Sequence, residues 1–445
     1  MQDNILNELL YPSPILNKRN IIYADCIATG RPSPIIENHM IEKILPYYSN
    51  THSNAYCGIN MKECIKHTKE YMRKELKLST NKKIIFTGSG CTGAINHLVF
   101  CLKLGSLCSV NIYLTPLEHH SNYLPWKELQ ETNKDKISLN ILKITSNYMI
   151  DLDHLKNILD RSEPNKINIF SITACSNVLG IKTNINEVSS LIKSYNTQDS
   201  CIYGVNNLLF LDYACIAPYD DIAGDICNAL FFSPHKFLGG PGTPGILIAD
   251  KELFKNRVPM TPGGGCVIKV CSKSITYDPD IEKKETGGTP NILGIIRIKK
   301  ILQLKKLFID YIKKREEELT KKIFNYAKNI NNLIIILPDI TKDRLPILCV
   351  AIKNLHYNFI VVLFNDLFSI QTRGGVSCTG ILAELIEKKY NINGWCRISV
   401  NWTNTDKEID FILNSLKYIA ENYEKYLDQY IFDQSSNLYM KKIDK

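Results

Sequence analysis

Six short apolar runs in the first 250 residues constrain the fold more than any other feature of the sequence. They occupy residues 83–87, 110–115, 167–173, 208–212, 229–232 and 246–249. The runs are nearly uninterrupted, and several are rich in β-branched residues, as expected for strands that are covered on both faces of a sheet. Helical patterns lie between several of them, for example over residues 93–104 and 187–195. Strands alternating with helices predict an α/β fold with a mostly parallel sheet.

The remaining chain has a different pattern. A long helical stretch follows Pro290 and extends to about Lys328. The later apolar runs are fewer and mixed with helical patterns, and they lie at residues 333–337, 347–352 and 396–400. Apolar residues at helical spacing between Ile409 and Leu416 indicate a final amphipathic helix. We therefore expect an N-terminal arm, a large α/β domain and a smaller α+β domain, at residues 1–20, 21–290 and 291–445.

Composition excludes several classes of protein. The 445 residues are 44% apolar and 22% charged, which is enough for a large core and unlike a disordered chain. The apolar runs are much shorter than the ~18 residues of a membrane span, and the first twenty residues lack a secretory pattern. Fifteen cysteines without a CxxC pair argue against a disulfide framework and a structural zinc module. We expect a cytoplasmic protein with no membrane partner.

The net charge of +9 comes from 54 basic and 45 acidic residues. The basic residues are spread along the chain. The densest stretch, residues 299–322, also carries Glu316, Glu317 and Glu318, as on the solvated face of a long helix. We predict no nucleic-acid partner.

The stretch Ser-Pro-His-Lys-Phe-Leu-Gly-Gly-Pro-Gly-Thr-Pro-Gly at residues 233–245 carries the strongest chemical signal. An apolar strand runs directly into it, which would hold Lys236 at the edge of the sheet where open α/β folds bind ligands. A lysine held there can form a Schiff base with an aldehyde. The alternative is an exposed lysine beside a glycine-rich turn. A second glycine-rich turn, residues 88–93, follows a strand and opens a helix, an arrangement that favours an anion.

Together these motifs resemble those of the class V aminotransferase family of fold-type I pyridoxal-phosphate enzymes. The resemblance extends over roughly residues 23–403 and is strongest to the branch of cysteine desulfurases and selenocysteine lyases. It implies the fold-type I architecture and a pyridoxal 5'-phosphate cofactor attached to Lys236.

The resemblance also implies roles around the cofactor phosphate. Cys91 and Thr92, in the turn at residues 88–93, correspond to phosphate contacts, as do Ser233 and His235. Thr289, in a Gly-Gly-Thr-Pro-Asn loop, corresponds to a threonine that reaches the phosphate of the other subunit, so a homodimer is expected. For this loop, a simple turn ahead of a helix is the alternative.

Further roles concern the cofactor ring. Asp212 ends an apolar strand, where a buried carboxylate costs several kcal/mol unless it is paired, and a pyridinium nitrogen would be its partner. The alternative is an aspartate that caps a turn. By resemblance His119 stacks on the ring and moves protons, and Asn177 contacts the ring oxygen. Cys215 stands where the well-known desulfurases carry a glutamine. His119 and His120 lack a third ligand at useful spacing, so we predict no metal.

The remaining candidates concern the substrate. Arg397, on a strand, suits a substrate carboxylate held by two hydrogen bonds, and Arg373 matches a second active-site arginine. A structural salt bridge is the alternative for each. Ala28 and His52 lie in segments that resemble the walls of the substrate pocket. Cys378, in a Gly-Gly-Val-Ser-Cys-Thr-Gly loop, matches the cysteine that takes sulfur; a buried, unreactive cysteine is the alternative.

We therefore predict a cysteine desulfurase that converts L-cysteine to L-alanine and leaves the sulfur as a persulfide on Cys378, with a sulfur-acceptor protein as a further partner. An aminotransferase or a selenocysteine lyase, for which Cys378 would be incidental, is the first alternative. A basic binding protein that keeps the fold without the chemistry is the second. The joint presence of Lys236, Asp212 and His119 argues against it.

Overall fold

The computed structural model describes residues 8–107, 109–163, 166–196 and 202–442. The chain folds into two compact units. The larger unit comprises Gly30–Cys175 and Thr183–Phe308. The smaller unit comprises Met1–Thr29, Ser176–Lys182 and Ile309–Lys445. Of the helices described, none combines the length and the apolar character that crossing a membrane requires.

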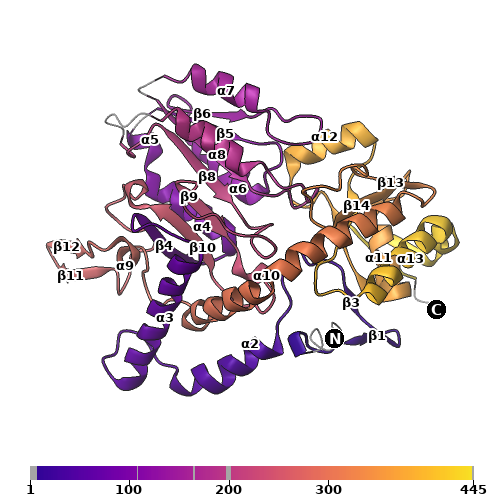
Figure 1. Cartoon of the computed structure of the whole chain (residues 1–445), viewed down its shortest axis with the longest axis horizontal. Coiled ribbons are helices and arrows are strands. Elements are labelled where there is room, and N and C mark those ends of the chain that lie inside the picture. The colour runs from indigo at the N-terminus through magenta and orange to yellow at the C-terminus, as the bar shows by residue number, and fades with distance from the viewer. Residues whose placement is uncertain (1–7, 108, 164–165, 197–201, 443–445) are drawn as a thin grey trace. The chain divides into compact units, whose positions relative to one another are not determined.

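A seven-stranded sheet organises the larger unit, with the strand order β4-β10-β9-β8-β7-β5-β6 (Figure 1). The strands are β4 (Lys82–Thr87), β5 (Val110–Leu114), β6 (Ile137–Ile141), β7 (Ile167–Thr173), β8 (Asn207–Asp212), β9 (Ala229–Phe232) and β10 (Gly245–Asp250). All neighbouring pairs are parallel except the two that β10 makes, with β4 and β9. The predicted mostly parallel α/β sheet is confirmed.

Helices cover both faces of this sheet because successive strand residues point to opposite sides. On β8, Leu208 and Phe210 belong to the core under α4 and α6, where Phe210 stacks on Trp126 at 5.9 Å between ring centroids. Leu209 instead lines a small cavity with residues of α8. The helices of this unit are α2 (Pro34–His39), α3 (Tyr56–Glu75), α4 (Gly90–Leu102), α5 (Leu104–Leu107), α6 (His120–Thr132), α7 (Leu152–Asp160), α8 (Ile185–Ser194) and α9 (Ile281–Lys284).

Several short elements complete the larger unit. A hairpin of β11 (Val267–Cys271) and β12 (Ser274–Tyr277) projects away from the rest of the unit (Figure 1). Short helical turns occupy Met40–Ile44, Leu45–Tyr47, Pro234–Lys236 and Lys251–Leu253. The long helix predicted after Pro290 is α10 (Ile292–Ala327), which belongs to the larger unit up to Phe308 and to the smaller unit from Ile309.

An antiparallel four-stranded sheet, in the order β13-β14-β17-β16, forms the centre of the smaller unit. Its strands are β13 (Leu333–Ile335), β14 (Ile347–Ile352), β16 (Arg373–Gly375) and β17 (Trp395–Ser399). Three helices accompany it, α11 (Tyr357–Phe368), α12 (Gly380–Tyr390) and α13 (Asp406–Asn422), followed by a helical turn at Tyr423–Gln429. Two-stranded pairs join β1 (Ile15–Leu16) to β2 (Arg19–Asn20), β3 (Ile22–Tyr23) to β15 (Ile370–Gln371), and β18 (Tyr430–Asp433) to β19 (Leu438–Lys441).

The compact units differ from the domain limits expected at residues 20 and 290. Residues 21–29 belong to the smaller unit because β3 pairs with β15 and the Ser399 N–H donates to the Ala24 carbonyl at 2.8 Å. Residues 176–182 also belong to it, because the Leu345 N–H donates to the Gly180 carbonyl at 2.9 Å. Hydrogen bonds between segments distant in sequence thus set these limits.

Candidate active site

The end of β9 positions the predicted lysine. Ser233 follows the strand directly, and the helical turn Pro234–Lys236 then presents the Lys236 side chain, which is half-buried. Among the described residues, none forms a hydrogen bond or an ion pair with the Lys236 amine. An amine held at the end of a buried strand without a protein partner is available to an aldehyde cofactor.

The first turn of α4, residues 90–92, and Ser233 together form a site lined by small groups, which we call the anion cradle. The Cys91 N–H donates to Ser233 Oγ at 2.8 Å. Gly90 has φ of +54°, and a Cβ there would lie 2.7 Å from Ser233 Oγ, so a side chain at this position would clash. Thr92 Oγ1 lies 2.7 Å from the hydroxyl of Ser121. A helix N-terminus lined by hydroxyls and free of side-chain bulk fits a phosphate. The structure thus brings together the predicted Cys91, Thr92 and Ser233.

His235 lies beside the same cradle and is half-buried. Its Cδ2 would be 3.7 Å from a Cβ built on Gly90, and its carbonyl accepts from the Gly30 N–H at 2.8 Å. Burial, together with the positive charge of Lys236, lowers the pKa of His235. The imidazole can therefore offer a neutral N–H to an anion.

Asp212 ends β8 and is 2% exposed. Its Oδ1 accepts from the Ala214 N–H at 2.8 Å. Burial raises the pKa of this carboxyl, although the Ala214 hydrogen bond, the charge of Lys236 and a hydrogen bond with the Cys91 thiol act in the opposite direction. A buried carboxyl whose net pKa is still raised is suited to a cationic partner such as a pyridinium nitrogen, so the residues present fit the cofactor.

His119 caps the N-terminus of α6. Its Nδ1 accepts from the Ser121 N–H at 3.1 Å, so in the neutral ring the proton is on Nε2. The preceding residue, Glu118, is buried and accepts from Thr115 Oγ1 at 2.6 Å and from Asn122 Nδ2 at 2.7 Å. Burial raises the pKa of Glu118 to about 7. Ser121 and Glu118 were not predicted. The Glu-His-His-Ser run contains both, but nothing in the run separates them from ordinary turn residues.

Thr289 and His52 are linked through Asn50. The Asn50 side-chain amide donates to Thr289 Oγ1 at 3.0 Å. Its oxygen accepts from the His52 N–H at 2.8 Å and lies 3.0 Å from His52 Nδ1. Both predicted residues are exposed in the single chain.

The smaller unit contains the two predicted arginines, and both contact Asp25. Arg397, on β17, is 3% exposed, and its Nη2 donates to Asp25 Oδ1 at 2.9 Å. Arg373 Nε donates to Asp25 Oδ2 at 3.0 Å. The structural salt bridge considered for each arginine is therefore present. Two guanidinium groups share one carboxylate, which leaves one positive charge for a further anion. Asp25 was not predicted.

Cys378 is an exposed residue in a largely half-buried loop of the smaller unit, and the backbone of this loop is unusual. Ser377 and Cys378 have φ values of +53° and +58°, in the left-handed region that non-glycine residues adopt at a cost of about 1–3 kcal/mol each. Asn177 Nδ2 donates to the Ser377 carbonyl at 2.9 Å, and the Asn177 carbonyl accepts from Arg397 Nη1 at 3.1 Å. The thiol is exposed, unlike the buried cysteine of the alternative interpretation.

Two further predicted residues, Ala28 and Cys215, have fewer contacts that bear on the site. Ala28 closes a turn in the smaller unit by donating its N–H to the Asp25 carbonyl at 3.0 Å. Cys215, in the larger unit, is 3% exposed and follows the strand that Asp212 ends. In the larger unit the structure therefore brings the lysine, the carboxylate and the anion cradle together. In the smaller unit it brings Arg373, Arg397, Asn177 and the Cys378 loop together.

A mostly parallel α/β sheet with a lysine at a strand end, a buried aspartate and an anion cradle is the arrangement of a pyridoxal-phosphate-dependent enzyme of fold type I. A sequence model described as aminotransferase class-V matches residues 22–412. The chain therefore belongs to the class-V aminotransferase family, whose enzymes use pyridoxal 5'-phosphate.

Individual relatives extend the comparison. A cysteine desulfurase of Wigglesworthia glossinidia is 27% identical over 427 residues, which cover 92% of this chain and 96% of the relative. A probable cysteine desulfurase of Borreliella burgdorferi is 29% identical, with 92% and 95% covered. The apo structure of a Thermococcus onnurineus cysteine desulfurase has a TM-score of 0.77 at 22% identity, covering 90% and 95% of the two chains. An Escherichia coli cysteine desulfurase in an S-sulfonic acid form also has a TM-score of 0.77, at 20% identity and 95% and 98% coverage. These structures support the fold-type I architecture.

Proposed function

We propose that this enzyme is a cysteine desulfurase, which converts L-cysteine to L-alanine and transfers the sulfur to Cys378. The exposed thiol of Cys378, on a loop that Asn177 connects to Arg397, is the observation that carries this proposal. The substrate Cβ–S bond breaks and an S–S bond to Cys378 forms, so the thiol becomes a persulfide and the substrate carbon skeleton leaves as alanine. The names of the relatives support the same activity.

Pyridoxal phosphate, when bound, supplies the electron sink that weakens the bonds at the substrate α- and β-carbons. We propose that the Lys236 amine holds it and afterwards accepts the substrate α-proton at Nζ. Asp212 would keep the ring nitrogen protonated. His119 would lie against the ring and donate a proton from Nε2, while Asn177 would contact the ring oxygen. Cys91, Thr92, Ser233 and His235 would hold the phosphate.

For the substrate, we propose that Arg397 and Arg373 bind the α-carboxylate. Asp25 fixes the orientation of both guanidinium groups before substrate arrives, which lowers the entropy cost of binding. Ala28 and His52 are proposed as walls of the substrate pocket.

We also propose a homodimer, in which Thr289 of each protomer contacts the cofactor phosphate of the other, and a protein that accepts the sulfur from Cys378. The location proposed is the cytoplasm. All thirteen cysteines in the described part of the chain are free, which supports a reducing compartment.

The test is to supply L-cysteine to protein reconstituted with pyridoxal phosphate and a reductant, and to quantify sulfide and alanine. Equal amounts of both are expected, and none from a Lys236→Ala variant. Borohydride should fix the cofactor on the peptide that contains Lys236. Formation of a 2-oxo acid would identify an aminotransferase instead. Release of selenide from L-selenocysteine without sulfide from L-cysteine would identify a selenocysteine lyase, and either result would contradict the proposal.

A further inference from the structure

Helix α9 (Ile281–Lys284) lies immediately before the loop that carries Thr289, and two carboxylates fix this helix. Glu282 accepts from Lys69 at 2.6 Å and from Arg73 at 2.5 Å, both on α3, and from the Ile84 N–H of β4 at 2.9 Å. Glu285 is the residue at which the helix ends. These contacts determine where the loop begins.

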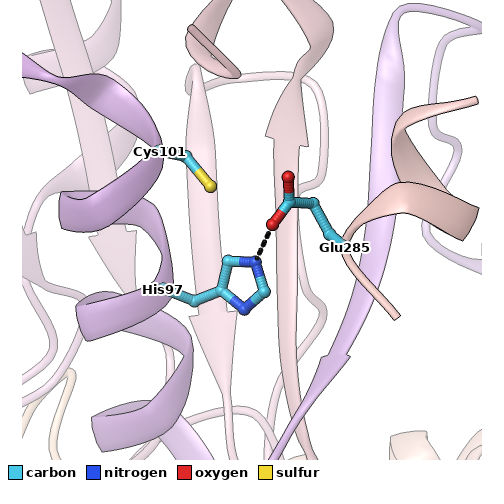
Figure 2. A group of neighbouring side chains, drawn as sticks. All are labelled: His97, Cys101 and Glu285. Atoms are coloured by element: carbon cyan, nitrogen blue, oxygen red, sulfur yellow. Dashed lines mark hydrogen bonds and ion pairs between the residues drawn. The ribbon is translucent and has the colours of Figure 1, made fainter. Parts of the chain in front are cut away.

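Glu285 is 2% exposed, and Figure 2 shows its contact with His97. Its Oε2 lies 2.9 Å from His97 Nε2 and accepts from the Met260 N–H at 3.2 Å. Its Oε1 accepts from Asn256 Nδ2 at 2.6 Å and lies 3.4 Å from the Lys284 ammonium. Burial alone would raise the pKa of Glu285, but the hydrogen bonds, first that of His97, lower it below its ordinary value. The group is therefore a carboxylate with its lone pairs occupied.

His97 places this contact on the helix of the anion cradle. It is 4% exposed and follows Cys91 by six positions on α4, which corresponds to about 9 Å along the helix axis. One buried contact therefore connects the helix whose first turn forms the cradle to the start of the Thr289 loop.

Fewer contacts fix the far end of the loop. Thr289 is exposed and receives a hydrogen bond from Asn50, and Gly288 donates its N–H to the Gly264 carbonyl at 2.7 Å. Gly288 has φ of +79°, a conformation that a residue with a side chain rarely adopts. Beyond Thr289, Asn291 Nδ2 donates to the Gly242 carbonyl at 2.8 Å in an exposed contact, whereas the Glu285 contacts at the start of the loop are buried.

His97, Glu285 and Cys101 could also be read as metal ligands, since their ligand atoms lie within 4.8 Å of one another. Three facts oppose a metal. Both Glu285 oxygens already accept from other groups, an ammonium group lies 3.4 Å from one of them, and burial raises the pKa of the Cys101 thiol, which therefore stays protonated. The cluster has the chemistry of a hydrogen-bond network.

We propose that His97 is a positioning residue, which acts through Glu285 to fix the position of the Thr289 loop relative to the anion cradle on α4. The inference rests on the proposed role of Thr289 at the cofactor phosphate. It assigns to this chain a buried link between the two segments that are proposed to contact cofactor phosphates.

The test measures the affinity of the cofactor-free protein for pyridoxal phosphate by fluorescence titration. His97→Leu keeps an apolar side chain of similar volume and removes the donor, and His97→Gln keeps an N–H donor near the position of Nε2. His97→Leu should weaken binding by about tenfold, as expected for loss of a buried hydrogen bond to a carboxylate, and His97→Gln should restore most of it. Equal binding by His97→Leu and wild type would overturn the proposal.

A double-mutant cycle identifies the route of the effect. If His97 acts only through Thr289, adding His97→Leu to Thr289→Ala should weaken binding no further. Leu98→Ala, a buried substitution on the same helix, should lower the melting temperature yet combine additively with Thr289→Ala. Glu285→Gln takes the place of His97→Leu in the cycle if the latter does not fold.

The outcomes distinguish the two proposals. Normal binding by Thr289→Ala alone would contradict the role of Thr289 in the proposed function. Weak binding by Thr289→Ala with an additive His97→Leu would contradict the positioning role only. If purified wild type contained stoichiometric zinc and Cys101→Ser did not, the cluster would be a metal site, and its interpretation as a hydrogen-bond network would be wrong.

Discussion

Asn177 donates its side-chain amide to the main-chain carbonyl of Ser377 at 2.9 Å, next to the proposed sulfur acceptor. Its own carbonyl accepts from Arg397 Nη1 at 3.1 Å. One residue of the segment 176–182 is therefore bonded to both the loop of Cys378 and the arginine proposed for the substrate carboxylate. The left-handed backbone at Ser377 needs such support, because it is unfavourable without it.

The first prediction concerns Asn177→Ala. Without the amide, the loop should sample other conformations, and sulfide release should fall by about tenfold or more, since nucleophile placement is sensitive to small displacements. If Asn177 acts mainly through the loop, the visible absorption band and the affinity for cofactor should change little. A shifted band would favour the predicted contact with the cofactor ring. Asn365→Ala, which removes an exposed asparagine of the same unit, is the control.

A second prediction follows from the pair of arginines on Asp25. Asp25→Ala leaves Arg397 buried without its carboxylate and should lower the free energy of unfolding by about 3–5 kcal/mol. Arg373→Ala removes a side chain that is 49% exposed and should cost about 0–1 kcal/mol. Urea denaturation of both variants checks the difference. Equal losses would mean that the Asp25–Arg397 contact is no stronger than an exposed ion pair.

Asp212 gives a prediction with a definite pH dependence. Burial raises its pKa in the folded cofactor-free protein, so the folded state binds the proton more tightly than the unfolded state. The contribution of Asp212 to stability is therefore largest at low pH and is lost as pH rises above about 3.9, the unfolded value. Asp212→Asn, which does not titrate, should be more stable than wild type at pH 7 when cofactor-free, and the advantage should shrink toward pH 4. The same variant should bind pyridoxal phosphate more weakly. Melting temperatures that differ equally at both pH values would contradict this assignment.

The sheet of the larger unit was accessible from sequence because its strands are buried on both faces. The strand β7 occupies Ile167–Thr173, as predicted, and every residue in it is buried. The strand β6 was missed, since Ile137–Ile141 lies at the sheet edge, is only partly buried and carries polar residues between its apolar ones. A continuous apolar signal exists only where both faces of a strand are covered.

Only part of the candidate site could be predicted from the sequence. Lys236 and Asp212 stand at strand ends, where local sequence shows both the strand and the polar residue that terminates it. Asp25 contacts Arg397 although the two are 372 positions apart in the sequence. The residues next to each of them in the sequence do not predict this contact. His97 and Glu285, 188 positions apart, went unnoticed for the same reason. Pairings of buried charges depend on how the chain folds back on itself.

The fourth prediction concerns the homodimer. If Thr289 contacts the cofactor of the partner, Lys236→Ala and Thr289→Ala each damage both sites of their own homodimers. Mixed dimers of the two variants should contain one site in which both residues are intact. Co-expression with two different tags, followed by purification through both, should therefore recover up to about half of the wild-type activity per dimer. A fully active monomer, or mixed dimers no better than the parents, would contradict sharing of sites.

The last prediction concerns Cys378 itself. Cys378→Ser should bind cofactor as wild type does, because no proposed cofactor contact involves the thiol. It should lose about two orders of magnitude or more in sulfide release, as expected when a covalent nucleophile is removed. Mass spectrometry of wild type after brief exposure to L-cysteine should find one additional sulfur on the peptide that contains Cys378.

Cys271 provides a matched control for this substitution, because it is the other exposed cysteine of the described residues. Its pKa is lowered by the Ser274 hydroxyl and by backbone N–H groups, so it is a chemically competent thiol. It lies on the β11–β12 hairpin of the larger unit, without the arginines that accompany Cys378 in the smaller unit. Cys271→Ser should therefore release sulfide at the wild-type rate. If Cys378→Ser also releases sulfide at the wild-type rate, sulfur is not transferred to Cys378. The proposed function would then be contradicted, even though the Cys378 thiol is exposed.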